Sequence, residues 1–230
     1  MTERLPPAPA SDELPTPLDG ELVELAAGAL WARLYFHTGR HPARWDRFRH
    51  VDVPAPSRVD ACGAPTVDGV AYAAVPTLAG GPFDVIGPLG TGDSSALATS
   101  VLEAVQDTRV LDRLDQRSFA VAELTRPLRV LDLASDWAAR AGAGSHLSTA
   151  PRRETARWAA AIATRWPELH GVAYIAATRP AGRAVALWSP AATEPVTTSK
   201  LLLLRTLDDP ALRGALAWAA HTTGVQLLTS

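Results

Sequence analysis

The sequence has very little of several features that define common protein classes. Cys62 is the one cysteine, which excludes an internal disulfide and a zinc site built on cysteines. The most apolar run covers residues 201–204, whereas a membrane-spanning helix needs about 20 apolar residues. The N-terminus has prolines and acids where a secretory signal would need an apolar run. We therefore expect a cytoplasmic protein in a reducing compartment, with no membrane contact.

Excess positive charge is also missing. The net charge is -2 and the sequence pI is about 6.3, so no long-range positive field would attract nucleic acid. Lys200 is the only lysine, so nearly all basic charge is arginine, whose planar guanidinium can bind phosphate bidentately. The histidines lack the spacing of helical zinc sites. We expect no direct nucleic-acid binding, no metal, and local binding of any anionic ligand.

The composition is that of a folded globular protein. Hydrophobic residues make up 47% and charged residues 20% of a length that suits one sizeable core. Residues 1–19 are rich in proline and acids without periodicity, which predicts a mobile leader or an arm that lies along the surface. We expect a single domain over residues 20–230, with a C-terminal extension from about residue 193.

Hydrophobic periodicity predicts more strands than helices in the middle of the chain. Strands are expected over 30–36, 69–75, 119–124, 128–133, 171–177, 183–189 and 225–228. Helices are expected over 22–29, 96–107, 136–141, within 149–169 and near 210–221, while the run at 201 fits either state. Residues 76–95 are rich in glycine and proline and are expected to form a long loop. Because strands and helices do not alternate regularly, we expect an α+β fold, a mixed β-sheet core with flanking helices.

A series of segments occurs in an order that resembles the RES domain, a family of bacterial toxins. The segments are ARLYFHTGRHP at 32–42, SRVD at 57–60, VAYAAV at 70–75, LEAVQDTRVLD at 102–112, PLRVLDLASDWAARAGA at 127–143, TARWAAAIA at 155–163 and HGVAYIAA at 170–177. The resemblance spans about residues 30–190, and PLRVLDL, ARW and GVAY followed by AVALW are distinctive as a set. It implies an ADP-ribosyltransferase-like fold.

The resemblance also implies an activity and a partner. Members of the family destroy NAD by hydrolysis or phosphorolysis, without a metal, usually as toxins neutralised by a helix-turn-helix antitoxin. An NAD glycohydrolase or phosphorylase of a toxin–antitoxin pair is therefore expected here. Two alternatives remain open, a protein ADP-ribosyltransferase and a catalytically inactive RES-like fold that binds a partner protein. The apolar tail from Leu201 onward could bury a homodimer face or an antitoxin groove.

Four residues correspond to functional positions of the family. Arg33 matches the first-strand arginine and Arg58 matches a second arginine, and together they would clamp the pyrophosphate of NAD. Tyr72 matches a strand tyrosine that would pack against nicotinamide or ribose. Glu103 matches the family glutamate and would stabilise the oxocarbenium charge that develops as the glycosidic bond breaks. Arg33, Tyr72 and Glu103 form the expected catalytic set.

Two positions depart from the family pattern. The family serine is replaced by Ala176, and Thr178 lies about 6 to 7 Å further along the same face of a strand. The residue that matches the family glutamate depends on which segment is used as the anchor, that is, to align this chain with the family. If QDTR is the anchor the residue is Glu103, and if residues 96–98 are the anchor Thr99 takes its place.

Overall fold

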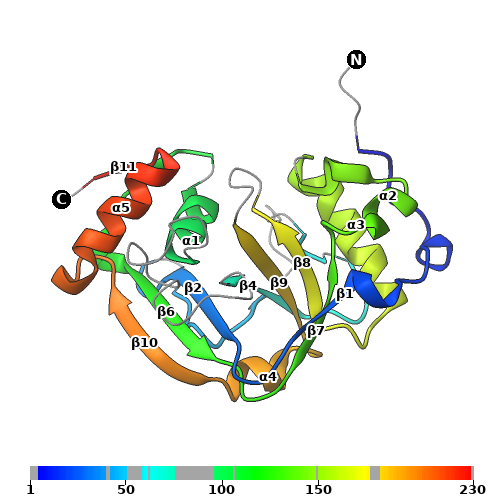
Figure 1. The fold of residues 1–230 in the computed structure, drawn as a ribbon, viewed down its shortest axis with the longest axis horizontal. Helices are drawn as coiled ribbons and strands as arrows, with labels where there is room; N and C mark the ends of the chain where they lie inside the picture. Colours follow the sequence, from blue (N-terminus) through cyan, green and yellow to red (C-terminus); the bar gives the residue numbers. More distant parts are fainter. Residues whose placement is uncertain are drawn as a thin grey trace.

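A curved, mixed β-sheet runs through the whole molecule (Figure 1). The computed structural model describes residues 5–39, 42–50, 59–61, 63–75, 96–105, 107–148, 150–176 and 182–228. The strands of this sheet are β1 (Leu22–Leu25), β2 (Leu30–Phe36), β3 (Arg49–His50), β4 (Gly69–Val75), β6 (Arg117–Glu123), β7 (Leu128–Asp132), β8 (Gly171–Ile175), β9 (Arg183–Ser189) and β10 (Lys200–Thr206). Their order is β1-β7-β8-β9-β4-β2-β6-β10, and β3 pairs with β4. Strands β7 and β8 are parallel and the other pairs are antiparallel, which confirms the predicted α+β class with a mixed sheet.

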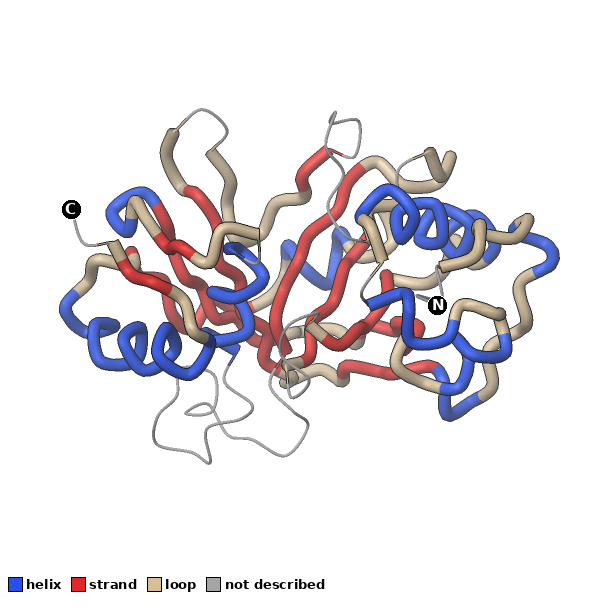
Figure 2. Tube along the Cα trace, turned by 90° about the horizontal axis from the view of Figure 1, so that it is seen from above, coloured by secondary structure: helices blue, strands red, loops and turns tan. Residues whose placement is uncertain are grey.

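The helices gather in two groups at opposite ends of the sheet (Figures 1 and 2). One group contains α1 (Ala96–Val105) and α5 (Arg213–Thr223), and the other contains α2 (Asp136–Arg140) and α3 (Arg152–Arg165). The short helix α4 (Thr193–Thr197) packs on the opposite face of the sheet. Beside α5, β11 (Gln226–Leu227) pairs in parallel with β5 (Val110–Leu111). Among the described residues, no helix is long and apolar enough to cross a membrane.

Side-chain alternation along the strands divides the core between the two faces of the sheet. In β4, Val70 and Ala74 pack in the clusters beneath α3 and α1, whereas Ala71 and Ala73 pack on the α4 face. This is the period of two that a strand imposes, and burial on both faces explains the continuous apolar run of β4.

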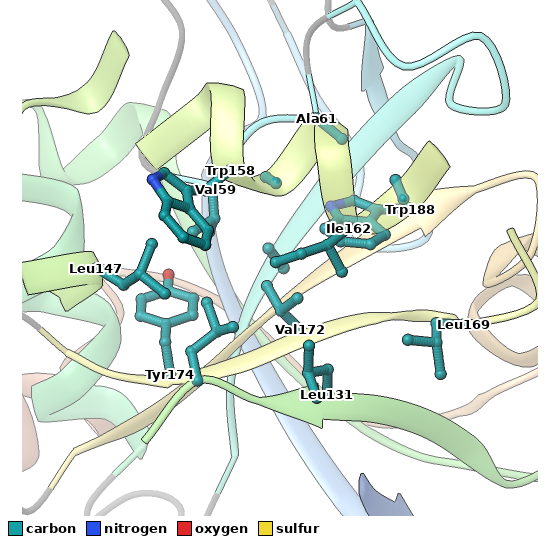
Figure 3. Close-up of a cluster of buried hydrophobic side chains, with 14 of the residues drawn as sticks. Val59, Ala61, Leu131, Leu147, Trp158, Ile162, Leu169, Val172, Tyr174 and Trp188 are labelled. Carbon is teal, nitrogen blue, oxygen red and sulfur yellow. The ribbon is translucent and has the colours of Figure 1, made fainter. Parts of the chain in front are cut away.

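The largest core cluster lies between α3 and the strands β7, β8 and β9 (Figure 3). Trp158 and Ile162 project from α3 over Val172 of β8 and Trp188 of β9, and all four are almost fully buried. Ala156, Ala159 and Ala163, together with Thr155, form the rest of the buried stripe of α3. These small side chains let the helix approach the sheet closely, so that the tryptophans fill the space between them.

The N-terminal segment packs against α2 and α3 over residues 5–19, in place of the expected mobile leader. Leu5 and Leu14 are only 5% and 3% exposed and belong to the largest core cluster. The indole of Trp158 donates to the carbonyl oxygen of Pro6 at 3.0 Å, and the indole of Trp137 donates to that of Pro15 at 2.8 Å. A proline-rich extended segment leaves its carbonyls available for such donors, so polar composition did not prevent ordering.

Most expected elements are confirmed, and the expected helix over 22–29 is wrong. Residues Leu22–Leu25 instead form β1, which pairs antiparallel with β7, because hydrogen bonds to a neighbouring strand override a short helical pattern. The run at 201 is a strand, β10, which extends the sheet beyond β6. The loop at 76–95 lies outside the described residues.

The buried leucines of the N-terminal segment give a test of its contribution to stability. We expect Leu14→Ala to lower the free energy of unfolding by about 2–4 kcal/mol, because it leaves a cavity in the largest core cluster. The matched control is Leu18→Ala, since Leu18 is 59% exposed and its truncation should change stability by less than about 0.5 kcal/mol. Urea denaturation followed by tryptophan fluorescence measures both, and equal effects would contradict the packing described.

Candidate active site

A cavity of about 370 Å³ lies on the sheet between the two helix groups, a size typical of small-molecule sites. It is lined by residues of β2, β4, β8, β9, α1, the turn after α1 and the first residue of α3. The lining residues are Leu34, Tyr72, Ala73, Ala74, Ser100, Glu103, Ala104, Asp107, Arg152, Tyr174 and Ala184. Segments far apart in the sequence therefore meet around one space.

Small residues in the middle of the sheet leave room for this cavity. Ala74 of β4 and Ala184 of β9 are opposite each other in the strand register, and Tyr174 of β8 is opposite Ala184 on the other side. Tyr72 stands two residues before Ala74 on the same face of β4. Two tyrosines thus flank a strip of alanines, so the cavity has aromatic walls over an alanine floor.

Glu103 is one of two carboxylates that line this cavity, beside Asp107, and Tyr174 positions it. The Tyr174 hydroxyl donates to Oε2 of Glu103 at 3.3 Å, and the tyrosine is only 2% exposed. The ring of Tyr174 is part of the largest core cluster (Figure 3), which fixes the hydroxyl at the edge of the cavity. A carboxylate held in this way is suited to stabilise a positive charge nearby.

Tyr72 belongs to a second hydrogen-bonded group. Its hydroxyl donates to Oδ1 of Asp60 at 2.5 Å, and Nη2 of Arg49 donates to both carboxylate oxygens of Asp60 at 2.6 and 2.8 Å. Burial raises the pKa of Tyr72 well above its usual value, and the negative charge of Asp60 raises it further. Tyr72 is therefore a neutral phenol at physiological pH, and it offers the cavity its ring rather than a basic oxygen.

Arg33 does not line this cavity. Its Nη1 donates to the backbone carbonyls of Arg44 and Trp45, at 3.2 Å each, and to that of Arg47 at 2.5 Å. The neighbouring Leu34 lines the cavity, so alternation along β2 places Arg33 on the opposite face of the sheet. Burial lowers the pKa of Arg33 to about 10, which leaves the guanidinium charged at neutral pH.

Of the four predicted residues, the structure brings Tyr72 and Glu103 to the same cavity. Arg58 lies outside the described residues. The other proposed position for the glutamate, Thr99, is 1% exposed and is not part of the cavity lining. Ala176 is also 1% exposed, and Thr178 lies outside the described residues.

Sequence reasoning did not single out Tyr174, Ser100, Asp107 or Arg152 as functional. A signal for Tyr174 was present, because the tetrapeptide GVAY occurs both at 69–72 and at 171–174. Both copies are strands that pair with β9, one on each side, which places both tyrosines on the same face. The other three residues have no comparable signal, since each lies in or beside a helix whose orientation only the fold defines.

Acidic and metal-ligating side chains are dispersed over the described part of the chain. Within it, no group of three or more histidine, cysteine, aspartate or glutamate side chains could hold a metal ion.

Comparisons with known proteins give one structural likeness. No protein-family model matches the chain, and no curated protein sequence matches it. Among solved structures, the chain is similar to a chain of the M. tuberculosis MbcT-MbcA toxin-antitoxin complex, with a TM-score of 0.48 and 14% sequence identity over 86% of this chain and 94% of that one. Both values are low, so the function proposed below rests on residues of this chain.

The ion pair between Arg49 and Asp60, the aspartate that accepts a hydrogen bond from Tyr72, can be tested by its effect on the free energy of unfolding. We expect Arg49→Met to lower the free energy of unfolding by about 3 kcal/mol, because it leaves the fully buried Asp60 carboxylate without its guanidinium. Adding Asp60→Asn should recover part of this loss, because the buried charge is removed. Arg44→Met is the control, since the Arg44 side chain is 65% exposed and water screens its pair with Asp46, so its loss should be much smaller. Chemical denaturation that gives equal losses for Arg49→Met and Arg44→Met would contradict this interpretation.

Proposed function

We propose that this chain is an NAD-consuming enzyme that cleaves the bond between nicotinamide and ribose, and that the cavity between α1 and α3 is its active site. The observation that carries the proposal is the Glu103 carboxylate, which Tyr174 positions in a cavity that Tyr72 also lines. A carboxylate can stabilise the positive charge that develops on the ribose, and an aromatic ring can pack against the nicotinamide.

The chemistry follows from the charge of the substrate. The nicotinamide nitrogen of NAD is positively charged, so nicotinamide leaves as a neutral molecule with the electron pair of the carbon–nitrogen bond. The ribose carbon then acquires oxocarbenium character, which the negative charge of Glu103 stabilises. A water molecule or a phosphate oxygen bonds to this carbon, and water releases one proton. The products are nicotinamide and either ADP-ribose or its 1-phosphate.

The resemblance to the RES domain supports the same site. Three of the segments that carry it, VAYAAV, LEAVQDTRVLD and HGVAYIAA, contain Tyr72, Glu103 and Tyr174, which line the cavity together. Three residues from separate segments that resemble the family therefore line the same cavity. A toxin role and an ADP-ribosyltransferase-like fold are part of this proposal and rest on that resemblance.

The two predicted arginines enter the proposal differently. We assign Arg33 a positioning role, because its guanidinium binds three backbone carbonyls, those of Arg44, Trp45 and Arg47, in the segment that leads to Arg49. Arg58 keeps its predicted role as a phosphate ligand, since it precedes Asp60, the partner of Tyr72, by two residues in the chain.

A partner protein is also proposed, with an exposed apolar strand as its site. β10 is an edge strand of the sheet, and Leu201, Leu202 and Leu204 are 39%, 43% and 43% exposed there. Exposed leucines on a sheet edge favour association. An antitoxin or a second copy of the chain would cover them.

A second candidate function is favoured by one observation. Ala176 follows Tyr174 on the same strand face and provides no hydroxyl where the family has serine. A fold that binds NAD or a partner without turnover would retain the cavity and lack this group.

The proposal is tested by incubating the purified protein with NAD, with and without phosphate, and measuring nicotinamide release. We expect release by the parent and a loss of about a hundredfold or more in Glu103→Gln, because the amide cannot stabilise the oxocarbenium charge. Glu24→Gln is the control, since Glu24 is exposed on β1 and should retain full activity.

Each other outcome of this experiment selects a different conclusion. Binding of NAD without release of nicotinamide would favour the non-catalytic candidate. Transfer of label from NAD to a protein would indicate an ADP-ribosyltransferase at the same site. If the protein neither binds NAD nor releases nicotinamide, the enzymatic proposal is refuted.

A further inference from the structure

We infer that Arg152 binds a phosphate group of the ligand and that Asp107 occupies the Arg152 guanidinium until the phosphate replaces it. The identity of the ligand as a dinucleotide rests on the proposed function. The inference itself concerns a phosphate site at one end of the cavity, which neither the sequence patterns nor the family residues indicated.

The ion pair between Arg152 and Asp107 joins the two helix groups across the cavity. Arg152 is the first residue of α3, and Asp107 lies two residues beyond the end of α1. Nη2 of Arg152 donates to Oδ2 of Asp107, and both residues line the cavity. Their side chains are 39% and 68% exposed, which places the pair at the solvent-accessible edge of the cavity.

The relative strengths of the two interactions favour replacement of Asp107 by a phosphate at the Arg152 guanidinium. An exposed ion pair contributes little to stability, because water screens both charges. A phosphate presents several anionic oxygens in a geometry that matches the guanidinium, so its bonds to arginine are bidentate and stronger. The Asp107 carboxylate is therefore a weak internal substitute that a phosphate-bearing ligand can displace.

Two further features of the same cavity suit an anion. α3 starts at Arg152 without a side-chain cap, so the positive end of its dipole faces this edge of the cavity. Ser100 of α1 lines the same cavity and is 7% exposed, and its buried hydroxyl has no hydrogen-bond partner within the described part of the chain. A buried hydroxyl without a partner is destabilising, and a hydrogen bond to a ligand oxygen would relieve this cost.

The charges of the cavity also orient the ligand. Glu103 is negative, so it attracts the nicotinamide cation and repels phosphate. Arg152 is the arginine among the cavity-lining residues and attracts phosphate. A dinucleotide would therefore place its nicotinamide ribose beside Glu103 and its pyrophosphate beside Arg152.

The test uses ADP-ribose, which has the pyrophosphate but no nicotinamide bond to cleave, and isothermal titration calorimetry. We expect Arg152→Gln to weaken binding about tenfold or more. Asp107→Asn should strengthen binding by up to about fivefold, because it removes the competing carboxylate. Nicotinamide riboside, which has no phosphate, should bind the parent and both variants alike.

The decisive result is that the two substitutions change the affinity for ADP-ribose in opposite directions. Both substitutions break the same ion pair, so a merely structural role would shift the affinity in the same direction in both variants. Arg153→Gln is the matched control, because Arg153 is the exposed neighbour on α3 and lies outside the cavity lining. It should change the affinity by less than about twofold.

The outcomes separate this inference from the proposed function. NAD cleavage by the parent, with both variants shifted in the same direction or unchanged, would overturn the inference and leave the function. Opposite shifts for ADP-ribose without any NAD cleavage would support the phosphate site and refute the enzyme. A parent that does not bind ADP-ribose would overturn the inference directly.

Discussion

The pairing of β9 with both β4 and β8 is the constraint on which the cavity depends. It places Tyr72 opposite Ala186 and Tyr174 opposite Ala184, so two tyrosines from distant parts of the chain flank one strand. The approach of β8 to β9 is very close at Gly171, whose φ is +150° and where an added Cβ would lie 1.9 Å from the carbonyl oxygen of Ala186. Glycine is therefore required there, and any side chain would separate the strands that define the site.

The two tyrosines occupy equivalent places and have different partners. Tyr72 donates to the fully buried Asp60, while Tyr174 donates to Glu103. One bond joins the tyrosine to a buried ion pair, and the other joins it to a carboxylate that lines the cavity. The same tetrapeptide thus has different partners at its two positions, because the element facing each hydroxyl differs.

Arginine also serves both purposes in this chain, and position decides which. Arg33 and Arg49 are directed at backbone carbonyls and at a buried carboxylate, where their charges stabilise the fold. Arg152 pairs with an exposed aspartate at the edge of the cavity, where the bond is weak enough to exchange. An arginine-rich composition therefore indicates little about anion binding until the partners of each guanidinium are known.

Local pattern determined which segments became strands and helices in this protein. The apolar run at 69–75 and the amphipathic stretch after residue 96 became β4 and α1, and Tyr72 and Glu103, which the ordered segments singled out, line one cavity. Tertiary structure decided the rest. Alternation places Arg33 and Leu34 on opposite faces of β2, but only the position of α1 determines which face borders the cavity. Pairing with β7 likewise turned a helical pattern into β1, because hydrogen bonds and burial supplied by distant residues outweigh the small free energy of local preference.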